Sequence, residues 1–318
     1  PVTVNALTHG LSIVSQMFCN EGDYVVMPDK FWGNYRLTFS TISDGVLSTY
    51  PIFDENDGFN VDGLLQKVEE CGKLRPKVIV VLNFPNNPTG YTPTLDEANR
   101  IVHGLKEIAD KGIKIIAVAD DAYFGMFYEN SIKESLFGML SGISENLLAV
   151  KLDGATKEAF VWGFRVGFIT FGATAPGQEK ALAALETKVT GLIRGMISNS
   201  PHLSQTAVLA GLTHPDFDKQ HDAKVEILKG RALKAKEVLK NSEYADQFKL
   251  YPFNSGYFLC LKLHHVESEK RRVHLLDKSG VGTVSTGTYD LRVAFSCIAD
   301  SDIEELFSII YQGCKDQA

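Results

Sequence analysis

The chain has 318 residues, of which 44% are hydrophobic and 22% are charged, and its formal net charge is −7. This length is enough for two domains, and the composition is that of an ordinary globular protein. The net negative charge argues against nucleic acid or an anionic membrane surface as the main partner. No apolar run approaches the roughly 20 residues that a membrane-spanning helix requires.

The five cysteines are scattered along the chain and form no CxxC pair. Neither they nor the eight histidines have the spacing of a metal site. This usage predicts reduced thiols in a cytoplasmic protein and no metal. The chain begins with Pro1, and its first residues show no signal-peptide pattern.

The first half of the chain alternates short apolar runs with longer helical patterns. Strands are predicted at 24–27, 77–82, 114–119, 147–152 and 166–171. Several of them are apolar on consecutive residues, which is typical of parallel strands covered on both faces. Helical periodicity occurs at 8–18, 61–70 and 95–110, and Thr94 with Glu97 forms a capping-box pattern before the last. This alternation predicts an α/β fold with a doubly wound, mostly parallel sheet.

The pattern changes after residue 180. Helices are predicted at 181–188 and 203–212, and a His-Pro-Asp sequence at 214–216 then interrupts the pattern. Residues 216–241 indicate one long, highly charged helix that bridges two domains. Strands at 248–251, 256–263 and 291–295 and a helix at 300–311 follow. We therefore expect a large cofactor-binding domain at 1–215 and a smaller C-terminal α+β domain at 216–318.

Polar residues follow two of the predicted strands. An Asn-Pro-Thr-Gly sequence at 87–90 comes after the strand that ends at Leu82, and Asp120 directly follows the strand at 114–119. Doubly wound folds bind ligands at the carboxyl ends of their strands. A carboxylate behind an apolar strand is partly desolvated, which is costly unless it meets a cation. An ordinary turn at 87–90 and a helix N-cap at Asp120 are the alternatives.

Lys157 comes soon after the strand at 147–152. A lysine at such a position forms a Schiff base when burial or a nearby cation lowers its pKa, and a solvated surface lysine is the alternative. Arg165, between two glycines, suits bidentate binding of a phosphate. With Asn87, Tyr123 and Arg292, these residues supply the groups that a cofactor with an aldehyde, a phenolic oxygen, a ring nitrogen and a phosphate requires.

The ordered set resembles the fold-type I pyridoxal-phosphate enzymes, in particular the class I and II aminotransferases related to aspartate aminotransferase. The matching motifs are Asn-Pro-Thr-Gly at 87–90, Asp-x-Ala-Tyr at 120–123, Thr-Lys at 156–157 and the arginines at 165 and 292. They extend over nearly the whole chain. The resemblance implies a transaminase with pyridoxal 5′-phosphate (PLP) as cofactor, amino acid and 2-oxo acid substrates, and a homodimeric assembly.

The resemblance also implies a role for each residue. Lys157 would form the Schiff base with the cofactor and move a proton to and from the substrate. Asp120 would pair with the ring nitrogen and keep it protonated, so that the ring accepts electrons. Asn87 and Tyr123 would bind the phenolic oxygen, and Arg165 would hold the phosphate.

Two further segments resemble cofactor contacts of the family. Trp32, in the sequence Phe-Trp-Gly-Asn-Tyr at 31–35, matches the position of the aromatic residue that stacks on the cofactor ring. A tryptophan that only fills the core is the alternative. Asp29 and Lys30, just before it, are predicted to lie on the solvated surface.

Residues 5–11 resemble the phosphate loop at a helix N-terminus, where backbone amides of Ala6, Leu7 and Thr8 would receive the phosphate. Ala6 stands where family members often have glycine, and Gly154 stands where many have a phosphate-binding serine. We therefore expect the phosphate to depend more on Thr8, on backbone amides and on the arginine, with Thr156 as a further source of a hydroxyl group.

Substrate binding would involve residues that lie far apart in the sequence. Arg292, with Asn87, would bind the α-carboxylate of the substrate. The sequence Ile-Arg-x-x-x-Ser-Asn-x-Pro at 193–201 resembles aspartate aminotransferases, in which the arginine reaches across the dimer to a distal carboxylate. Arg194 and Ser198 therefore suggest aspartate or a similar dicarboxylic donor in a ping-pong reaction. A purely structural arginine at the subunit interface is the alternative.

Other functions of the same fold stay open. A PLP-dependent lyase or synthase, such as a carbon–sulfur lyase, would keep the same core residues and need no oxo-acid acceptor. A ligand-sensing domain of a transcription regulator would require a basic DNA-binding segment outside this sequence. Members of the family are usually longer at the N-terminus, so we expect the chain to be N-terminally incomplete.

Overall fold

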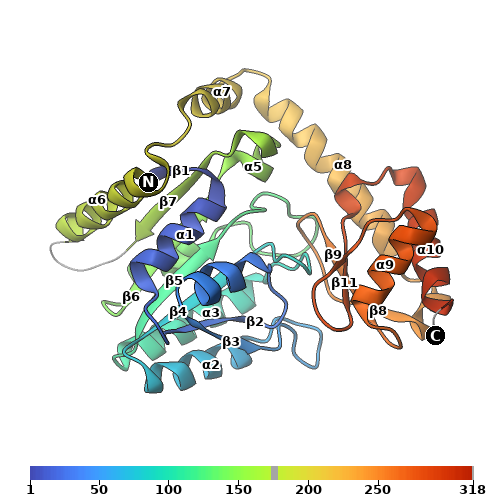
Figure 1. Cartoon of the computed structure of the whole chain (residues 1–318), viewed down its shortest axis with the longest axis horizontal. Helices are drawn as coiled ribbons and strands as arrows, with labels where there is room; N and C mark the ends of the chain where they lie inside the picture. Colours follow the sequence, from blue (N-terminus) through green and yellow to red (C-terminus); the bar gives the residue numbers. More distant parts are fainter. Residues whose placement is uncertain (173–177, 317–318) are drawn as a thin grey trace.

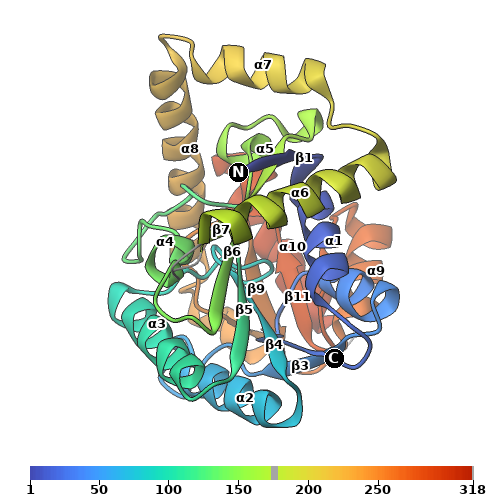
Figure 2. The same cartoon turned by 90° about the vertical axis from the view of Figure 1, so that its left-hand side faces the viewer.

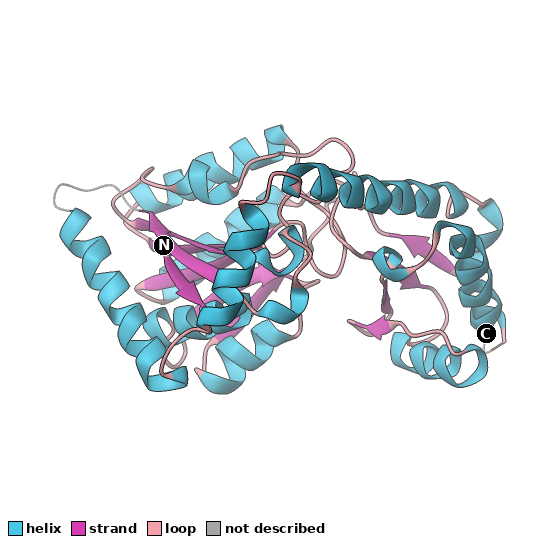
Figure 3. Cartoon of the chain, turned by 90° about the horizontal axis from the view of Figure 1, so that it is seen from above, coloured by secondary structure: helices cyan, strands magenta, loops and turns pink. Residues whose placement is uncertain are grey.

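The computed structural model describes residues 1–172 and 178–316, and the statements below concern these residues. The chain forms two lobes, each built on its own β-sheet (Figure 1). The larger lobe has a seven-stranded sheet in the order β1-β7-β6-β5-β4-β2-β3, and the smaller lobe has a four-stranded sheet in the order β10-β11-β9-β8. Seen from above, the larger sheet lies among helices, and the smaller sheet lies in the second lobe (Figure 3).

Five neighbouring strands of the larger sheet are parallel. They are β6 (Leu147–Asp153), β5 (Lys114–Asp120), β4 (Lys77–Asn83), β2 (Tyr24–Pro28) and β3 (Val46–Tyr50). At one edge, β7 (Gly167–Gly172) is antiparallel to β6, and β1 (Val2–Val4) is antiparallel to β7. The predicted α/β fold with a mostly parallel sheet is therefore confirmed.

Helices cover both faces of this sheet. They are α1 (Ala6–Phe18), α2 (Val61–Leu74), α3 (Leu95–Asp110) and α6 (Gln178–Ile197). Val78 and Val80 of β4 share a core with α2 and α3, whereas Ile79 and Val81 share the opposite core with α1 and α6. Because successive side chains of a strand point to opposite faces, this division makes the sheet doubly wound. Figure 2 shows α2 and α3 together on one side.

Shorter elements complete the larger lobe. They are the π-helix η1 (Arg36–Ile42), α4 (Leu136–Leu140), α5 (Ala155–Glu158), the 3₁₀-helix η2 (Trp162–Phe164) and α7 (His202–Leu212). The capping box predicted at the start of α3 is present, with Thr94 and Glu97 bonding to each other's backbone N–H groups. The helix predicted at 181–188 is longer than expected and forms part of α6.

The smaller lobe begins with the long helix α8 (Phe217–Val238). Its strands are β8 (Phe248–Leu250), β9 (Leu259–Leu263), β10 (Val284–Ser285) and β11 (Asp290–Val293). Its helices are η3 (Ser242–Asp246), α9 (Ser268–Ser279), η4 (Phe295–Cys297), η5 (Asp300–Asp302) and α10 (Ile303–Lys315). Leu261, Leu291 and Phe307 lie in its core.

The predicted boundary at residue 215 lies in the linker between α7 and α8. Met126 and Tyr128, from the loop after β5, nevertheless pack into the core of the smaller lobe. The limits 1–215 and 216–318 therefore stay a prediction.

One strand prediction at 256–263 was wrong in its first half. Only 259–263 form β9, because residues 254 and 255 bond to the turn at 87–90, as described below. Within residues 1–172 and 178–316, no helix is both long and apolar enough to cross a membrane.

Candidate active site

A cavity of about 510 Å³ opens at the carboxyl ends of β4, β5 and β6 and extends toward the smaller lobe. All ten residues predicted to bind the cofactor line it, and so does Arg292. The lining residues are Ala6, Leu7, Thr8, Trp32, Tyr35, Asn83, Asn87, Asp120, Ala122, Tyr123, Thr156, Lys157, Phe160, Trp162, Arg165, Tyr257, Phe258 and Arg292. Residues from nearly the whole length of the chain thus meet at one place.

Asp120 ends β5 and is only 1% exposed. Its carboxylate accepts a hydrogen bond of 2.6 Å from the Tyr35 hydroxyl and one of 3.1 Å from the backbone N–H of Ala122. Burial raises the pKa of Asp120, and these hydrogen bonds and the nearby Lys157 oppose the rise without cancelling it. The carboxylate is therefore desolvated and placed to receive a cationic group from the cavity.

Lys157 lies in α5, the short helix after β6, and its Nζ atom is 5.0 Å from the ring centroid of Tyr123. Burial lowers the pKa of Lys157, Asp120 partly opposes this, and Arg165 adds to the lowering. A lowered pKa increases the fraction of neutral amine, which is the nucleophilic and proton-accepting form.

Arg292 connects β11 of the smaller lobe to the turn at 87–90. Its Nη1 atom donates a hydrogen bond of 2.9 Å to the side-chain oxygen of Asn87, and its guanidinium carbon lies 4.2 Å from the ring centroid of Phe258. The backbone N–H of Asn87 donates to the side-chain oxygen of Asn83 at 2.9 Å. Burial raises the pKa of Tyr123 above its usual range, so that its phenol stays protonated.

The turn at 87–90 also holds the two lobes together. Gly90 has a φ of 76°, and its carbonyl accepts hydrogen bonds from the backbone N–H groups of Asn254 and Ser255 at 3.0 and 2.9 Å. A Cβ atom on Gly90 would lie 2.2 Å from the carbonyl oxygen of Phe258. The positive φ and this close contact explain why glycine occupies position 90. The hydrogen bonds of the turn also bring Tyr257 and Phe258 into the cavity.

The N-terminus of α1 and the loop after Lys157 form the other end of the cavity. Ala6 has a φ of 63°, a left-handed conformation that glycine adopts more easily. A Cβ atom on Gly154 would lie 2.6 Å from the carbonyl oxygen of Val166, so this position has no room for a side chain. The Thr156 hydroxyl is buried and has no hydrogen-bond partner among the described residues.

The sequence profile described as aminotransferase class I and II matches residues 1–310. The chain belongs to this family. Class I and II aminotransferases are PLP-dependent.

Curated relatives carry aminotransferase names. The chain is similar to the LL-diaminopimelate aminotransferase of Aquifex aeolicus, with 23% identity over 88% of this chain and 65% of the relative. It is 22% identical to the aspartate aminotransferase of Pyrococcus horikoshii over 93% of this chain and 71% of that protein. It thus spans only about 65% of the length of the first of these relatives.

A solved aminotransferase from Anaerococcus prevotii shares the fold. It superposes with a TM-score of 0.82 at 20% identity, and the match covers 100% of this chain and 75% of that one.

Two departures from the usual family pattern have local explanations in this chain. The left-handed backbone at Ala6 accounts for the glycine that family members often have there. At Gly154, the close approach of β7 excludes the serine that many members carry, because even a Cβ would lie 2.7 Å from the Cα atom of Gly167. Thr156 and Thr8 are then hydroxyl-bearing residues that line the cavity.

Arg194 and Ser198 lie away from the cavity of their own chain. Arg194 is in the last turn of α6, and its Nη1 atom donates to the Ser198 hydroxyl at 2.8 Å on the exposed surface. Neither residue lines the cavity in the single chain. Their assignment to the substrate site stays a prediction that depends on a second copy of the chain.

Sequence reasoning missed five aromatic residues of the cavity: Tyr35, Phe160, Trp162, Tyr257 and Phe258. Tyr35 was within the segment assigned to Trp32, and its position one helical turn later was the available signal. Tyr257 and Phe258 were hidden in a segment that resembles a strand. The Tyr257 hydroxyl lies 3.4 Å from the carbonyl oxygen of Lys157, to which it donates.

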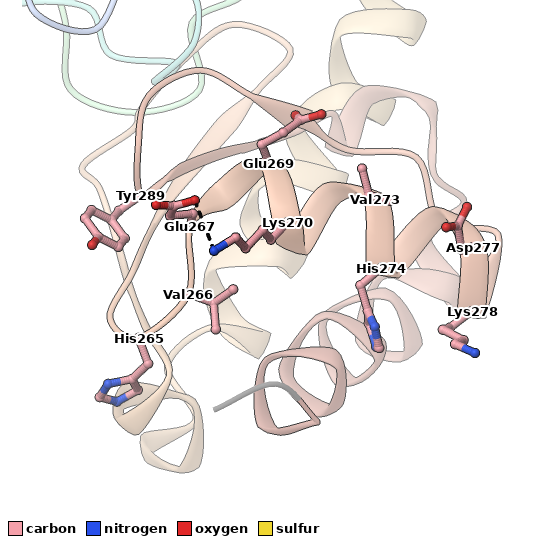
Figure 4. A pocket seen from close by; sticks show the side chains of 10 residues that line it. All are labelled: His265, Val266, Glu267, Glu269, Lys270, Val273, His274, Asp277, Lys278 and Tyr289. Atoms are coloured by element: carbon pink, nitrogen blue, oxygen red, sulfur yellow. Dashed lines mark ion pairs between the residues drawn. The ribbon is translucent and has the colours of Figure 1, made fainter.

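A larger groove of about 720 Å³ lies along α9 in the smaller lobe (Figure 4). Half of its lining residues are charged, and two of these, Lys270 and Glu267, form an ion pair of 3.5 Å. None of the predicted site residues lies there, so size alone does not identify the active site.

Proposed function

We propose that this class I and II aminotransferase transfers an amino group between an amino acid and a 2-oxo acid, with PLP as its resident cofactor. The observation that carries the proposal is the meeting of Lys157, Asp120 and Arg292 in one cavity at the carboxyl ends of the parallel strands. An amine of lowered pKa, a buried carboxylate and a half-buried guanidinium are three separate requirements of this reaction.

The residues of the cavity fit PLP. The buried carboxylate of Asp120 would pair with the protonated ring nitrogen, which gives this desolvated group the cation that it lacks. The unpartnered Thr156 hydroxyl, Arg165 and the N-terminus of α1 would hold the phosphate, since all three supply hydrogen-bond donors at one end of the cavity. Trp32 lines the same cavity as an aromatic wall.

PLP, when bound, supplies an aldehyde for the amino group and a ring that accepts electrons from the substrate. The protein residues bind, orient and move protons. Arg292 would bind the substrate α-carboxylate by two parallel hydrogen bonds, with its orientation fixed by Asn87. Lys157, released as a neutral amine, would move the proton from the substrate Cα atom to the cofactor within one half of a ping-pong cycle, and would move a proton in the opposite direction in the second half.

We further propose a dicarboxylic donor such as aspartate. Within one chain, Arg292 is the cavity-lining cation that is not already assigned to the cofactor, and it serves the α-carboxylate. A second carboxylate then requires a cation from elsewhere, and Arg194 of a second copy is the candidate because it is exposed and its motif resembles that of aspartate aminotransferases. The functional form would therefore be a homodimer, and we expect it in the cytoplasm.

A half-reaction screen tests this proposal. The PLP-loaded protein is mixed with single amino acids, and the visible absorbance of the bound cofactor is recorded. We expect aspartate or glutamate to change it fastest, and net turnover to require a 2-oxo acid. Lys157→Ala should abolish the response, whereas Lys106→Ala, on the exposed face of α3, should not. Repeated turnover without a 2-oxo acid would favour a lyase instead, and an unchanged response in Lys157→Ala would contradict the proposal.

A further inference from the structure

A largely buried ion pair, with side chains 10% and 17% exposed, joins the two lobes beside the candidate active site. Lys30, expected on the surface from its sequence, is only 9% exposed. Its Nζ atom lies 3.1 Å from Asp29 Oδ2 and 3.2 Å from Asp290 Oδ2, and 4.7 Å from the ring centroid of Tyr251. The Tyr251 hydroxyl donates to Asp290 Oδ1 at 2.9 Å. Lys30 belongs to the larger lobe, whereas Asp290 and Tyr251 belong to the smaller one.

The ion pair lies next to the residues that would bind the substrate. Asp290 and Arg292 are two residues apart on β11, so their side chains point to the same face of the strand. Lys30 is two residues before Trp32, which lines the cavity. Lys30 and Asp290 are thus each only two residues away in sequence from a cavity residue of their own lobe.

A hydrogen bond within the larger lobe connects Lys30 to the residue that precedes Asn87. The side-chain amide of Asn86 donates to the backbone carbonyl of Lys30 at 3.3 Å. The next residue, Asn87, accepts the 2.9 Å hydrogen bond from Arg292. β11 therefore contacts the larger lobe through two side chains, Asp290 with Lys30 and Arg292 with Asn87, and the two partners lie in adjoining loops.

The energetics of this pair do not favour a simple stabilising role. Burial acts to lower the pKa of Lys30, but Asp29 and Asp290 outweigh it and raise the pKa above its usual range. The ammonium is therefore charged, and a buried ion pair contributes little to net stability because desolvation offsets the attraction. What such a pair does supply is a fixed geometry between the segments that carry it.

We propose that Lys30 and Asp290 are positioning residues that hold Arg292 at the distance from Lys157 that a substrate with one α-carboxylate and one α-amine requires. The inference rests on the proposed function, because it assigns the α-carboxylate to Arg292. Misplacement of a binding group by about 1 Å, even by a distant change, costs up to about 100-fold in rate. Loss of the ion pair should therefore weaken substrate binding and leave the cofactor site intact.

The chain contains a matched control. Lys249 on β8 and Asp57 in the larger lobe form another interlobe ion pair, at 2.9 Å, with both side chains 54% exposed. Its residues line no part of the cavity. Removing it breaks an ion pair of the same type between the same lobes without touching β11.

The experiment compares Lys30→Met and Asp290→Asn with Lys249→Met. For the two buried variants we expect KM for both substrates to rise and kcat/KM to fall about 10- to 100-fold, with an unchanged visible spectrum of the bound cofactor. Lys249→Met should keep wild-type values. The double variant Lys30→Met/Asp290→Asn should be no worse than either single one, because the two residues act as one unit.

Hydrogen exchange of the purified full chain provides a readout that does not depend on activity. We expect the amides of residues 290–293 to exchange about tenfold faster in Lys30→Met than in the wild type, and not in Lys249→Met. If Lys30→Met does not fold, Tyr251→Phe, which removes only the hydrogen bond to Asp290, takes its place. Equal effects of the buried and exposed variants, or no effect on exchange and kcat/KM, would overturn the inference. A wild-type protein without transaminase activity would instead contradict the proposed function, and exchange would still decide the role of the ion pair.

Discussion

The hydroxyl group of Tyr35 donates a hydrogen bond of 2.6 Å to the carboxylate of Asp120, and both residues are only 1% exposed. Tyr35 follows Trp32 by three residues, so one turn of chain supplies both a cavity wall and a support for the acid group. The bond favours the ionised form of Asp120, against the effect of burial.

Tyr35→Phe should therefore raise the pKa of Asp120. A smaller fraction of Asp120 is then ionised at a given pH, so we expect the acid limb of the kcat/KM profile to move to higher pH. A hydrogen bond to a charged group contributes about 1.5–3 kcal/mol, so PLP affinity should fall about tenfold or more. Cofactor titration and a pH–rate profile measure both effects. Tyr50→Phe is the control, because Tyr50 is equally buried but its hydroxyl has no hydrogen-bond partner in the described chain. An equal loss of PLP affinity in both variants would contradict the role of Tyr35.

Thr156→Val separates cofactor binding from stability. In the described part of the chain the Thr156 hydroxyl is buried without a partner, so its removal should leave the unfolding free energy of the cofactor-free protein unchanged or slightly higher. PLP affinity should fall about tenfold if the hydroxyl binds the phosphate. Thr283→Val removes another such hydroxyl, in the smaller lobe, and should not alter PLP affinity. Unfolding curves with and without PLP report both quantities, and unchanged affinity in Thr156→Val would remove this residue from the phosphate site.

Gly90→Ala should destabilise the fold by two separate effects. The left-handed backbone at Gly90 costs a residue with a Cβ about 1–2 kcal/mol, and the contact of 2.2 Å with the Phe258 carbonyl adds a steric cost of about 1–3 kcal/mol. Gly112 also has a positive φ, of 97°, but nothing lies within 4 Å of the position of its Cβ. Gly112→Ala should therefore show the backbone cost alone. Denaturant unfolding compares the two, and equal losses would show that the interlobe contact at Gly90 is unimportant.

Mixed dimers test whether Arg194 acts across an interface. Lys157→Ala and Arg194→Ala should each lose most of their activity toward aspartate. When the two variants are combined in one dimer, one site regains Lys157 from one chain and Arg194 from the other, so we expect part of the activity to return. Activity toward an apolar amino acid serves as the internal control for Arg194→Ala. No recovery in the mixed dimers would mean that Arg194 does not serve the neighbouring site.

The sequence predicted site residues best where their position follows from a nearby strand. Asp120 ends one buried parallel strand and Lys157 lies soon after the next one. The carboxyl ends of such strands meet at one edge, so the convergence of these residues follows from the fold class. The antiparallel direction of β7 was not predictable in the same way, because the apolar run at 166–171 fits a strand of either direction.

Residues that depend on a distant partner were harder to predict. Lys30 resembles any surface lysine until Asp290, 260 residues later, is placed beside it. Phe258 lies in an apolar segment that resembles a strand. The residues just before it instead bond outside the sheet, Asn254 and Ser255 to Gly90 and Gly256 to Met126. Such long-range contacts are absent from local periodicity and propensity.

Ala6 and Arg292 line the same cavity although 285 residues separate them in the sequence. A bound cofactor and substrate would therefore bridge the first and last parts of the chain, and any ligand that binds only the folded form stabilises it by mass action. Cofactor binding and folding are then linked. A cell short of vitamin B6 would hold less of this protein in its folded, protease-resistant form, in addition to having less active protein.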